Sequence, residues 1–382
     1  MNRLDLTGLT TRPAQVWGGI RLVPLVREEP ITDLRLRREL LEDALLAVEA
    51  GRGTVYTSYV PHGFVADWAR DGQWQAAYGT QLCSDYDAPD DEPVHAVPLR
   101  RLVQRAGAQR LRFLPLHLAM DGYLALHFGG PSVLWDEWSQ RALRRGLSPR
   151  AEMAYAGAAV EGLDDALRIF EIHPGQCGVM VYAADALAAA FVVPHPDDYR
   201  ALHASLLQDM YGELVYQHAY YGQPVSEFAA RIADDARIRS LADLRAAARE
   251  QERAWAEAHD TQMANGLLDE AYEFRQLRRM GGYRLVRFLP PFERQREQHI
   301  GEAITDLKGR VAYLKTIRLG ENQIRRGHLL SQLARHDWNL ENTAATLGAS
   351  PVELVRRIRA AGFDGLLKRH VVESAQRGRW GD

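Results

Sequence analysis

The stretch His328–Phe363 reads HLLSQLARHDWNLENTAATLGASPVELVRRIRAAGF and predicts three short helices. The first spans residues 328–336 and places three leucines on one face, Leu329, Leu330 and Leu333. The second spans residues 341–347. It follows Asn339 and Asp337, either of which can cap a helix N-terminus.

The third predicted helix, residues 351–361, has clear start and stop signals. Gly348 supplies the turn before it, Ser350 is a suitable N-cap, and Pro351 pre-sets the first turn. Gly362 ends the helix. Its expected inward side chains are Val352, Val355 and Ile358. Its expected outward side chains are Arg356, Arg357 and Arg359.

These residues resemble the Fis-type helix-turn-helix, which closes many bacterial enhancer-binding regulators. The resemblance spans residues 327–370 and rests on Trp338-Asn339-Leu340, Ala344-Ala345, Leu347-Gly348, Ser350, Leu354, Arg356-Arg357-Ile358-Arg359 and Gly362-Phe363. It implies that the third helix is a recognition helix for the major groove of duplex DNA. The expected DNA-binding residues are Ser350, Arg356, Arg357, Arg359, Lys368 and Arg369.

The sequence departs from the Fis-type pattern in two ways. Pro351 and Glu353 stand early in the third helix, where the family offers polar or basic side chains. Glu353 would repel phosphate unless it reads the amino group of a cytosine. The chain also lacks the G-x-x-x-x-G-K-[ST] loop of an AAA+ ATPase. A module of three helices can instead serve as a protein docking unit, and that alternative stays open.

The charge of the chain is divided unevenly. Residues 281–382 carry 18 Lys and Arg against 11 Asp and Glu, whereas residues 1–280 carry 29 against 39. A basic last third behind an acidic body indicates that an anionic partner would meet the C-terminal region.

Residues 224–326 are charged and rich in helix-forming residues, which predicts a helical connector. Within it we expect a helix over residues 293–319. On that helix apolar residues recur at spacings of 4, 3, 4 and 3, at Ile300, Ile304, Leu307, Val311 and Leu314. This short seam could pack on its own domain or join two copies of the chain in a homodimer.

Residues 1–223 predict an α+β domain, so the fold class of the whole chain is α+β. A strand is expected over residues 19–26 and a helix over residues 32–50. In the unit 163–220, a helix precedes the strands GVMVYA and LAAAFVV, and a long helix begins at Asp197.

That unit resembles the core of the ARG-and-rhodanese-phosphatase-associated proteins (ARPP). The resemblance spans residues 15–220 and rests on the order hairpin then helix in GVMVYAADALAAAFVVPHPDDYRALHASLLQDMYGEL. It implies an α+β fold and an accessory role, with a link to bacterial stress or conflict systems. It carries over no catalytic residue.

Candidate chemistry in the front domain is sparse. His173 and Cys177 could pair as base and nucleophile, but both flank a turn that enters a strand, which favours a buried structural cysteine. A second cluster lacks the two-histidine spacing of a helical zinc site: His195, Asp197, Asp198 and His203.

Two further features favour structural roles. The acidic loop 84–93 lacks the D-x-D-x-D-G order of a calcium loop. His117 and His127 fall on the two strands of a hairpin predicted over residues 110–128, where sheet-face histidines are common. We therefore expect no catalytic residue, no cofactor and no metal.

Together these features predict a cytoplasmic bacterial accessory or regulatory protein that binds duplex DNA. The two cysteines fit a reducing compartment, and neither a signal peptide nor a membrane-spanning run is evident. One alternative is a non-catalytic assembly protein that forms a homo-oligomer or docks on a partner encoded nearby. Another is an enzyme or sensor for a nucleotide-derived ligand.

Overall fold

The computed structural model describes residues 3–36, 46–49, 55–58, 64–68, 74–77, 97–98, 162–200, 203, 207, 215–229, 231–232, 235–363 and 367–376. Its centre is an antiparallel sheet of nine strands in the order β1-β3-β10-β11-β15-β14-β13-β12, with β2 also paired to β3. The strands are β1 (Leu9–Thr11), β2 (Gln15–Trp17), β3 (Ile20–Arg27), β10 (Gln176–Ala183), β11 (Ala186–Val192), β12 (Glu273–Met280), β13 (Tyr283–Leu289), β14 (His299–Asp306) and β15 (Val311–Arg318).

Three of the predicted strands form one side of this sheet. β3 is buried along its whole length and pairs with β10, and β10 turns directly into β11. The turn holds Ala184 and Asp185, both with positive φ, as a tight turn between antiparallel strands requires. Burial on both faces explains why these strands read as continuous apolar runs rather than as an alternation.

β15 lies in the middle of the sheet, between β11 and β14. Its pairing with β11 places Phe191 opposite Lys315 and Val192 opposite Leu314. The helical connector predicted over residues 224–326 is therefore wrong, because β12, β13, β14 and β15 fall within it. The α+β domain continues past residue 223, to the end of β15 at Arg318.

The helix predicted over residues 293–319 is likewise wrong, since β14 and β15 form a hairpin there. Its five seam residues do not share one face. Ile300, Ile304, Val311 and Leu314 are distributed among three hydrophobic cores, and Leu307 lies in the turn with 59% of its surface exposed. The helical seam is therefore absent. Both strands are buried on both faces along most of their length, so apolar residues recur at spacings of 4 and 3 without forming one stripe.

The two faces of the sheet carry separate cores. One face packs Leu22, Val181 and Phe191 against Tyr199, Leu207 and Val215, which lie on the helical segment after β11. The other face packs Met180, Val286 and Leu314 under Leu4 and Leu267. Leu267 belongs to α8 (Asn265–Leu268). The helix predicted from residue 163 is present as α5 (Leu163–Ala166), continued by a 3-10 turn over Leu167–Ile169.

Two small sheets lie beside the main one, and their strands are β4 (Leu34–Leu36), β5 (Leu46–Glu49), β6 (Val55–Ser58), β7 (Phe64–Trp68), β8 (Trp74–Ala77) and β9 (Val97–Pro98). Their orders are β4-β7-β8 and β6-β5-β9. The helix predicted over residues 32–50 is wrong at both ends of that range, where the structure has β4 and β5. The acidic loop 84–93, the hairpin 110–128 and its two histidines His117 and His127 lie outside the described residues.

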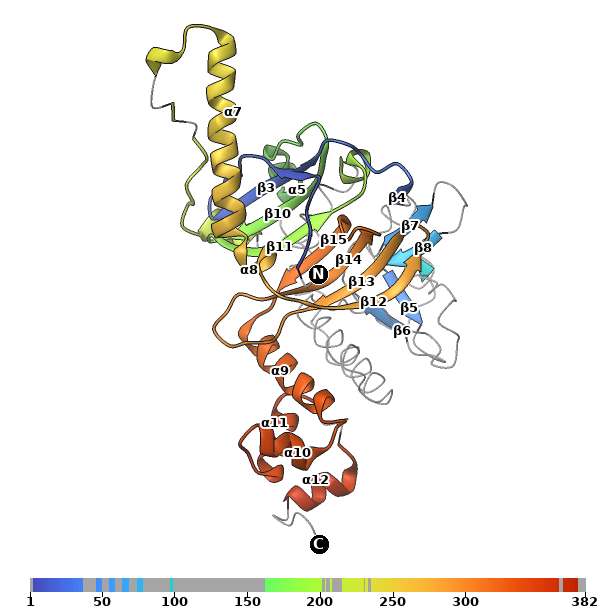
Figure 1. Ribbon diagram of the computed structural model, residues 1–382. Coiled ribbons are helices and arrows are strands. Elements are labelled where there is room, and N and C mark those ends of the chain that lie inside the picture. The colour runs from blue at the N-terminus through green and yellow to red at the C-terminus, as the bar shows by residue number, and fades with distance from the viewer. Residues whose placement is uncertain are drawn as a thin grey trace.

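A long helix, α7 (Leu241–Ala258), projects from one end of the molecule, and the C-terminal helices extend from the opposite end (Figure 1). No residue of α7 is buried. It continues into a π-helical turn over His259–Met263, which anchors it to the sheet domain. Within the described residues, no helix is long and apolar enough to cross a membrane.

The last helices are α9 (Glu321–Arg335), α10 (Leu340–Thr346), α11 (Pro351–Ala360) and α12 (Arg369–Gln376). They share a core with the sheet domain, because Leu289, Phe292 and Ile300 pack with Leu330 and Ile358. Phe292 packs directly against Gly327 on α9. A Cβ atom added at Gly327 would lie 2.2 Å from the Phe292 ring. Only glycine lets α9 approach the sheet domain this closely.

The substitution Gly327→Ala should therefore destabilise the protein. Phe292 is buried and cannot easily move aside, so we expect a loss of about 1–3 kcal/mol and a lower midpoint of thermal unfolding. The control is Gly282→Ala, where an added Cβ meets no atom within 4 Å. Equal midpoints for the two variants would contradict the close packing of α9 on Phe292.

Candidate functional site

The outer face of α11 carries the residues expected to bind DNA. The Ser350 Oγ atom accepts a hydrogen bond from the Glu353 backbone N–H (3.2 Å), and Pro351 follows at the start of the helix. Leu354, Val355 and Ile358 are buried on the inner face. This leaves three exposed arginines on the outer face: Arg356, Arg357 and Arg359.

The turns on either side of α10 fix how α10 and α11 meet. Asn339, one of the two predicted caps, accepts a hydrogen bond from the Asn342 backbone N–H (3.0 Å). Gly348 adopts a left-handed backbone between α10 and α11, with φ of 59°. Ala344 is buried where the helices cross. Each of these residues has the local role that its type predicts.

Glu353 has an ion-pairing role that the sequence alone did not reveal. Its carboxylate lies 3.2 Å from the Arg357 Nε atom and 3.8 Å from an Arg356 guanidinium nitrogen. In the free protein, therefore, one acidic side chain binds two of the three outward arginines. These contacts are exposed, so a phosphate could replace the carboxylate at small cost.

The other two expected DNA-binding residues lie at the start of α12. Lys368 and Arg369 are exposed, and the Arg369 Nε atom lies 3.1 Å from the Glu373 carboxylate.

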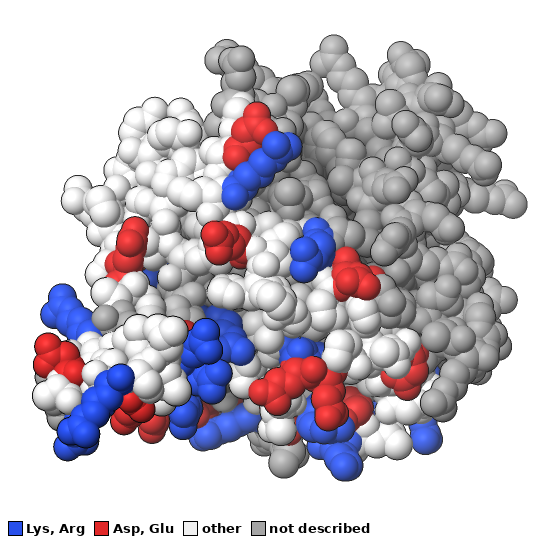
Figure 2. Space-filling view, turned by 90° about the horizontal axis from the view of Figure 1, so that it is seen from above, with Lys and Arg blue, Asp and Glu red and all other residues white. Residues whose placement is uncertain are grey.

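The opposite end of the molecule has no surface of one charge sign among the described residues in view. On the face seen from the α7 end, basic and acidic side chains are interleaved (Figure 2).

The candidates of the front domain have structural environments. Cys177 is buried beside Arg27, and burial raises the pKa of its thiol to about 11, which disfavours the thiolate needed for nucleophilic attack. His203 is buried and bonded to the Tyr199 hydroxyl (2.9 Å), and burial lowers its pKa to about 4. His195 lies 3.6 Å from Asp197. No three potential ligand residues in the described ranges cluster as a metal site.

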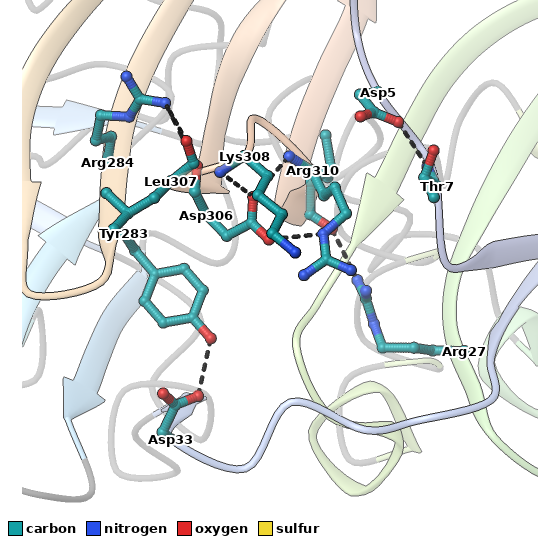
Figure 3. A network of polar contacts seen from close by, with 11 residues as sticks. Asp5, Thr7, Arg27, Asp33, Tyr283, Arg284, Asp306, Leu307, Lys308 and Arg310 are labelled. Atoms are coloured by element: carbon teal, nitrogen blue, oxygen red, sulfur yellow. Dashed lines mark hydrogen bonds and ion pairs between the residues drawn. The ribbon is translucent and has the colours of Figure 1, made fainter.

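A polar network ties the end of β3 to the β14–β15 turn (Figure 3). The Asp306 carboxylate accepts hydrogen bonds from the Lys308 and Arg310 backbone N–H groups and from the Arg310 Nε atom. Burial alone would raise the pKa of Asp306, but these hydrogen bonds outweigh it and lower the pKa. Arg27 donates to the Val311 carbonyl (3.0 Å). Most of these hydrogen bonds hold backbone groups of the β14–β15 turn in place, and the Asp306–Arg310 ion pair braces the same turn, so the network is structural.

Sequence reasoning missed a buried hydrogen-bonded chain on the other face of the sheet. The Tyr182 hydroxyl lies 2.7 Å from the His259 Nε2 atom, and the His259 Nδ1 atom lies 2.7 Å from the Asp260 carboxylate. Trp255 stacks on the His259 ring. Tyr182 and His259 are 77 positions apart, so no local motif could show their contact.

It also missed a buried charged row across three neighbouring strands. Arg287 on β13, Glu302 on β14 and Lys315 on β15 are paired in register, and the Arg287 guanidinium lies 3.2 Å from the Glu302 carboxylate. The Lys315 Nζ atom has no hydrogen-bond partner. Burial raises the pKa of Glu302 to about 7 and lowers the pKa of Lys315 to about 7. Burial thus disfavours the charged form of both Glu302 and Lys315.

The comparisons with known proteins identify the front domain. The ARPP-2 family model matches residues 4–281, which is more than half of the chain. The chain belongs to the ARPP-2 family. The match ends at the turn between β12 and β13, so β13, β14 and β15 complete the sheet beyond the matched residues. No curated protein and no solved structure matches the chain.

The Lys315 environment gives a stability that depends on pH. Between pH 7 and 10.5 the unfolded chain keeps a proton on Lys315 that the folded chain has lost, so stability rises with pH in this window. The variant Lys315→Met should lack this rise, and its thermal midpoint should drop relative to wild type by several degrees between pH 7 and 10. Lys308→Met, which changes an exposed lysine, should follow wild type. Parallel pH profiles for Lys315→Met and wild type would show that the buried amine is not neutral in the folded protein.

Proposed function

We propose that this chain is an accessory or regulatory protein that binds duplex DNA through α11. The observation that supports this most is the division of α11 into a buried apolar stripe and an outer face with three exposed arginines. Guanidinium groups bind phosphates and read guanine in the major groove. The Fis-type resemblance of residues 327–370 gives the same helix the recognition role.

The N-terminal end of α11 supports the same assignment. Residue Ser350 keeps its hydroxyl at the surface of the helix start, where backbone N–H groups and the helix dipole favour a phosphate. Glu353 lies one turn further on. In the proposed complex it exchanges its contacts with Arg356 and Arg357 for the amino group of a cytosine, or it remains a penalty that limits affinity.

The ARPP-2 domain would supply the regulatory part of this function. We propose that it senses a partner or small molecule within a bacterial stress or anti-phage conflict system, as the family resemblance suggests. The core shared by Phe292, Ile300 and Leu330 supports mechanical coupling, because a shift of the sheet end would displace α9.

A second candidate is a non-catalytic assembly protein. The observation that favours it is the tip of α7, where Leu241 and Leu244 are exposed and no side chain is buried. In this alternative the protein docks on a partner or on a second copy of itself, and the C-terminal helices contribute to docking. Sedimentation of the full chain distinguishes the two candidates, since assembly predicts a concentration-dependent mass without DNA.

DNA binding should depend on the three outward arginines. Replacing Arg356, Arg357 and Arg359 together with alanine should weaken binding to a duplex at low salt by roughly tenfold or more. The slope of log affinity against log salt should fall by about one unit for each arginine that contacts a phosphate. The measurement is fluorescence anisotropy with a labelled duplex over a salt series.

The matched control replaces three exposed arginines of α7, namely Arg245, Arg249 and Arg253, with alanine. This variant removes the same charge and should bind like wild type. The proposal fails if wild type does not bind a duplex at low salt, or if both triple variants lose affinity equally.

The role of Glu353 gives a prediction of opposite sign. Glu353→Gln frees Arg356 and Arg357 and removes a charge that repels phosphate, so affinity for duplex DNA of unselected sequence should rise by about threefold to tenfold. Glu257→Gln makes the same charge change on α7 and should have little effect. A loss of affinity with Glu353→Gln would instead assign Glu353 a direct contact to a base.

A further inference from the structure

A pocket lies where the sheet domain meets α9. Its volume is about 770 Å³, within the range of pockets that hold small molecules. Its walls come from the start of β12, the segment that follows β13, and α9. The pocket thus joins residues of the matched ARPP-2 region to the C-terminal helices.

The apolar walls of the pocket are aromatic and held in place. Tyr272 is buried, and its hydroxyl donates to the Leu267 carbonyl (2.9 Å). Its ring belongs to the core of the sheet domain, where it packs on Phe288 and Phe274 at centroid distances of 4.9 and 6.2 Å. Tyr272 therefore supports the half-buried Phe274 from behind, and both residues line the pocket. Pro290 and Pro291 form the adjoining wall. A flat and rigid apolar wall favours a ligand with a flat aromatic ring. The protein side chains are already ordered, so little conformational entropy is lost when the ring stacks on them.

Phe292 closes the pocket on the α9 side in a strained conformation. It has a positive φ of 57°, which is rare for an aromatic residue. The same ring packs on Gly327. Strain of this kind persists only where the surroundings enforce it, and it is concentrated at ligand sites.

Two charged side chains line the pocket, and neither makes an ion pair with a described residue. Arg335, on α9, is exposed and makes no ion pair with any described residue. Glu273 lines the pocket from β12 and is also without an ion-pair partner among the described residues. An unpaired guanidinium beside an aromatic wall suits an anionic group attached to a ring.

We propose that this pocket binds a small molecule in which a flat aromatic ring carries a carboxylate or a phosphate. The ring would lie against Phe274 and the two prolines, and the anionic group would pair with Arg335. Glu273 would accept a hydrogen bond from an N–H or O–H group of the ligand. A carboxylate source and a nucleotide source share this chemistry, and the test below distinguishes them.

A ligand in the pocket would change the position of the C-terminal helices, because Phe292 lines the pocket and also packs on Gly327 of α9. An effect of the ligand on DNA affinity would rest on the proposed DNA binding, whereas binding of the ligand to the pocket does not. The two are measured separately below, so the failure of one can be distinguished from the failure of the other.

The test measures binding to the full chain by calorimetry and thermal shift. The probes are benzoate, indole-3-carboxylate and adenosine monophosphate, with benzamide, indole and adenosine as neutral counterparts and inorganic phosphate as the anion without a ring. At least one aromatic anion should bind and raise the unfolding temperature, and it should do so more strongly than its neutral counterpart or phosphate alone. Binding of the carboxylates only, or of the nucleotide only, identifies the source.

Two variants locate the site, and a third is the matched control. Arg335→Gln should weaken the aromatic anion by about tenfold to a hundredfold and leave the neutral counterpart unchanged. Arg325→Gln changes another exposed arginine of α9, one that pairs with Glu321, and should have no effect. Ala334→Phe places a ring inside the pocket and should abolish binding of both ligands.

The proposal is overturned if no aromatic anion binds wild type. It is also overturned if Arg335→Gln and Arg325→Gln bind the anion equally, even where Ala334→Phe fails to fold. DNA binding of wild type is measured in parallel without any ligand. Failure of the ligand proposal therefore leaves the proposal that α11 binds DNA intact, and failure of DNA binding leaves the ligand proposal intact.

Discussion

The pairing of β11 with β15 is the constraint on which the rest of the structure depends. It joins a strand that ends at Val192 to one that begins at Val311, in the middle of the sheet. Without it, the sheet would separate into a β1-β3-β10-β11 part and a β12–β15 part. The ARPP-2 match ends before β13, so the matched residues build the sheet only together with the strands that follow.

This register also decides what lies on each side of the charged row. Ile304 follows Glu302 by two positions on β14, and Tyr313 precedes Lys315 by two positions on β15. Both belong to the core that contains Leu22 and Phe191. Ile300, two positions to the other side, belongs to the core shared with the C-terminal helices. The buried charges thus stand at the boundary between two apolar cores.

Local signals predicted the local structure well. Ser350, Pro351 and Gly348 each act through their own backbone, and α11 begins at Pro351 as expected. The β10–β11 hairpin was visible for the same reason. The spacing of the apolar residues in the β14–β15 hairpin favoured a helix because both strands are buried on two faces and show no alternation, and because their partner strand β11 is remote in sequence. The His259 chain, the charged row and the pocket all need such remote contacts, so no spacing in the sequence reveals them.

The proposed DNA-binding surface depends on a sheet that is completed by β15 and that holds α9 and, through it, α11 in place. Hydrogen exchange of the intact chain, with and without duplex DNA, tests it in one measurement. We expect slow exchange in β11 and β15 in both states, and additional protection by DNA in residues 349–360 but not in α7. Fast exchange of β15 would contradict the sheet, and unchanged exchange at residues 349–360 in the presence of DNA would contradict the proposed surface.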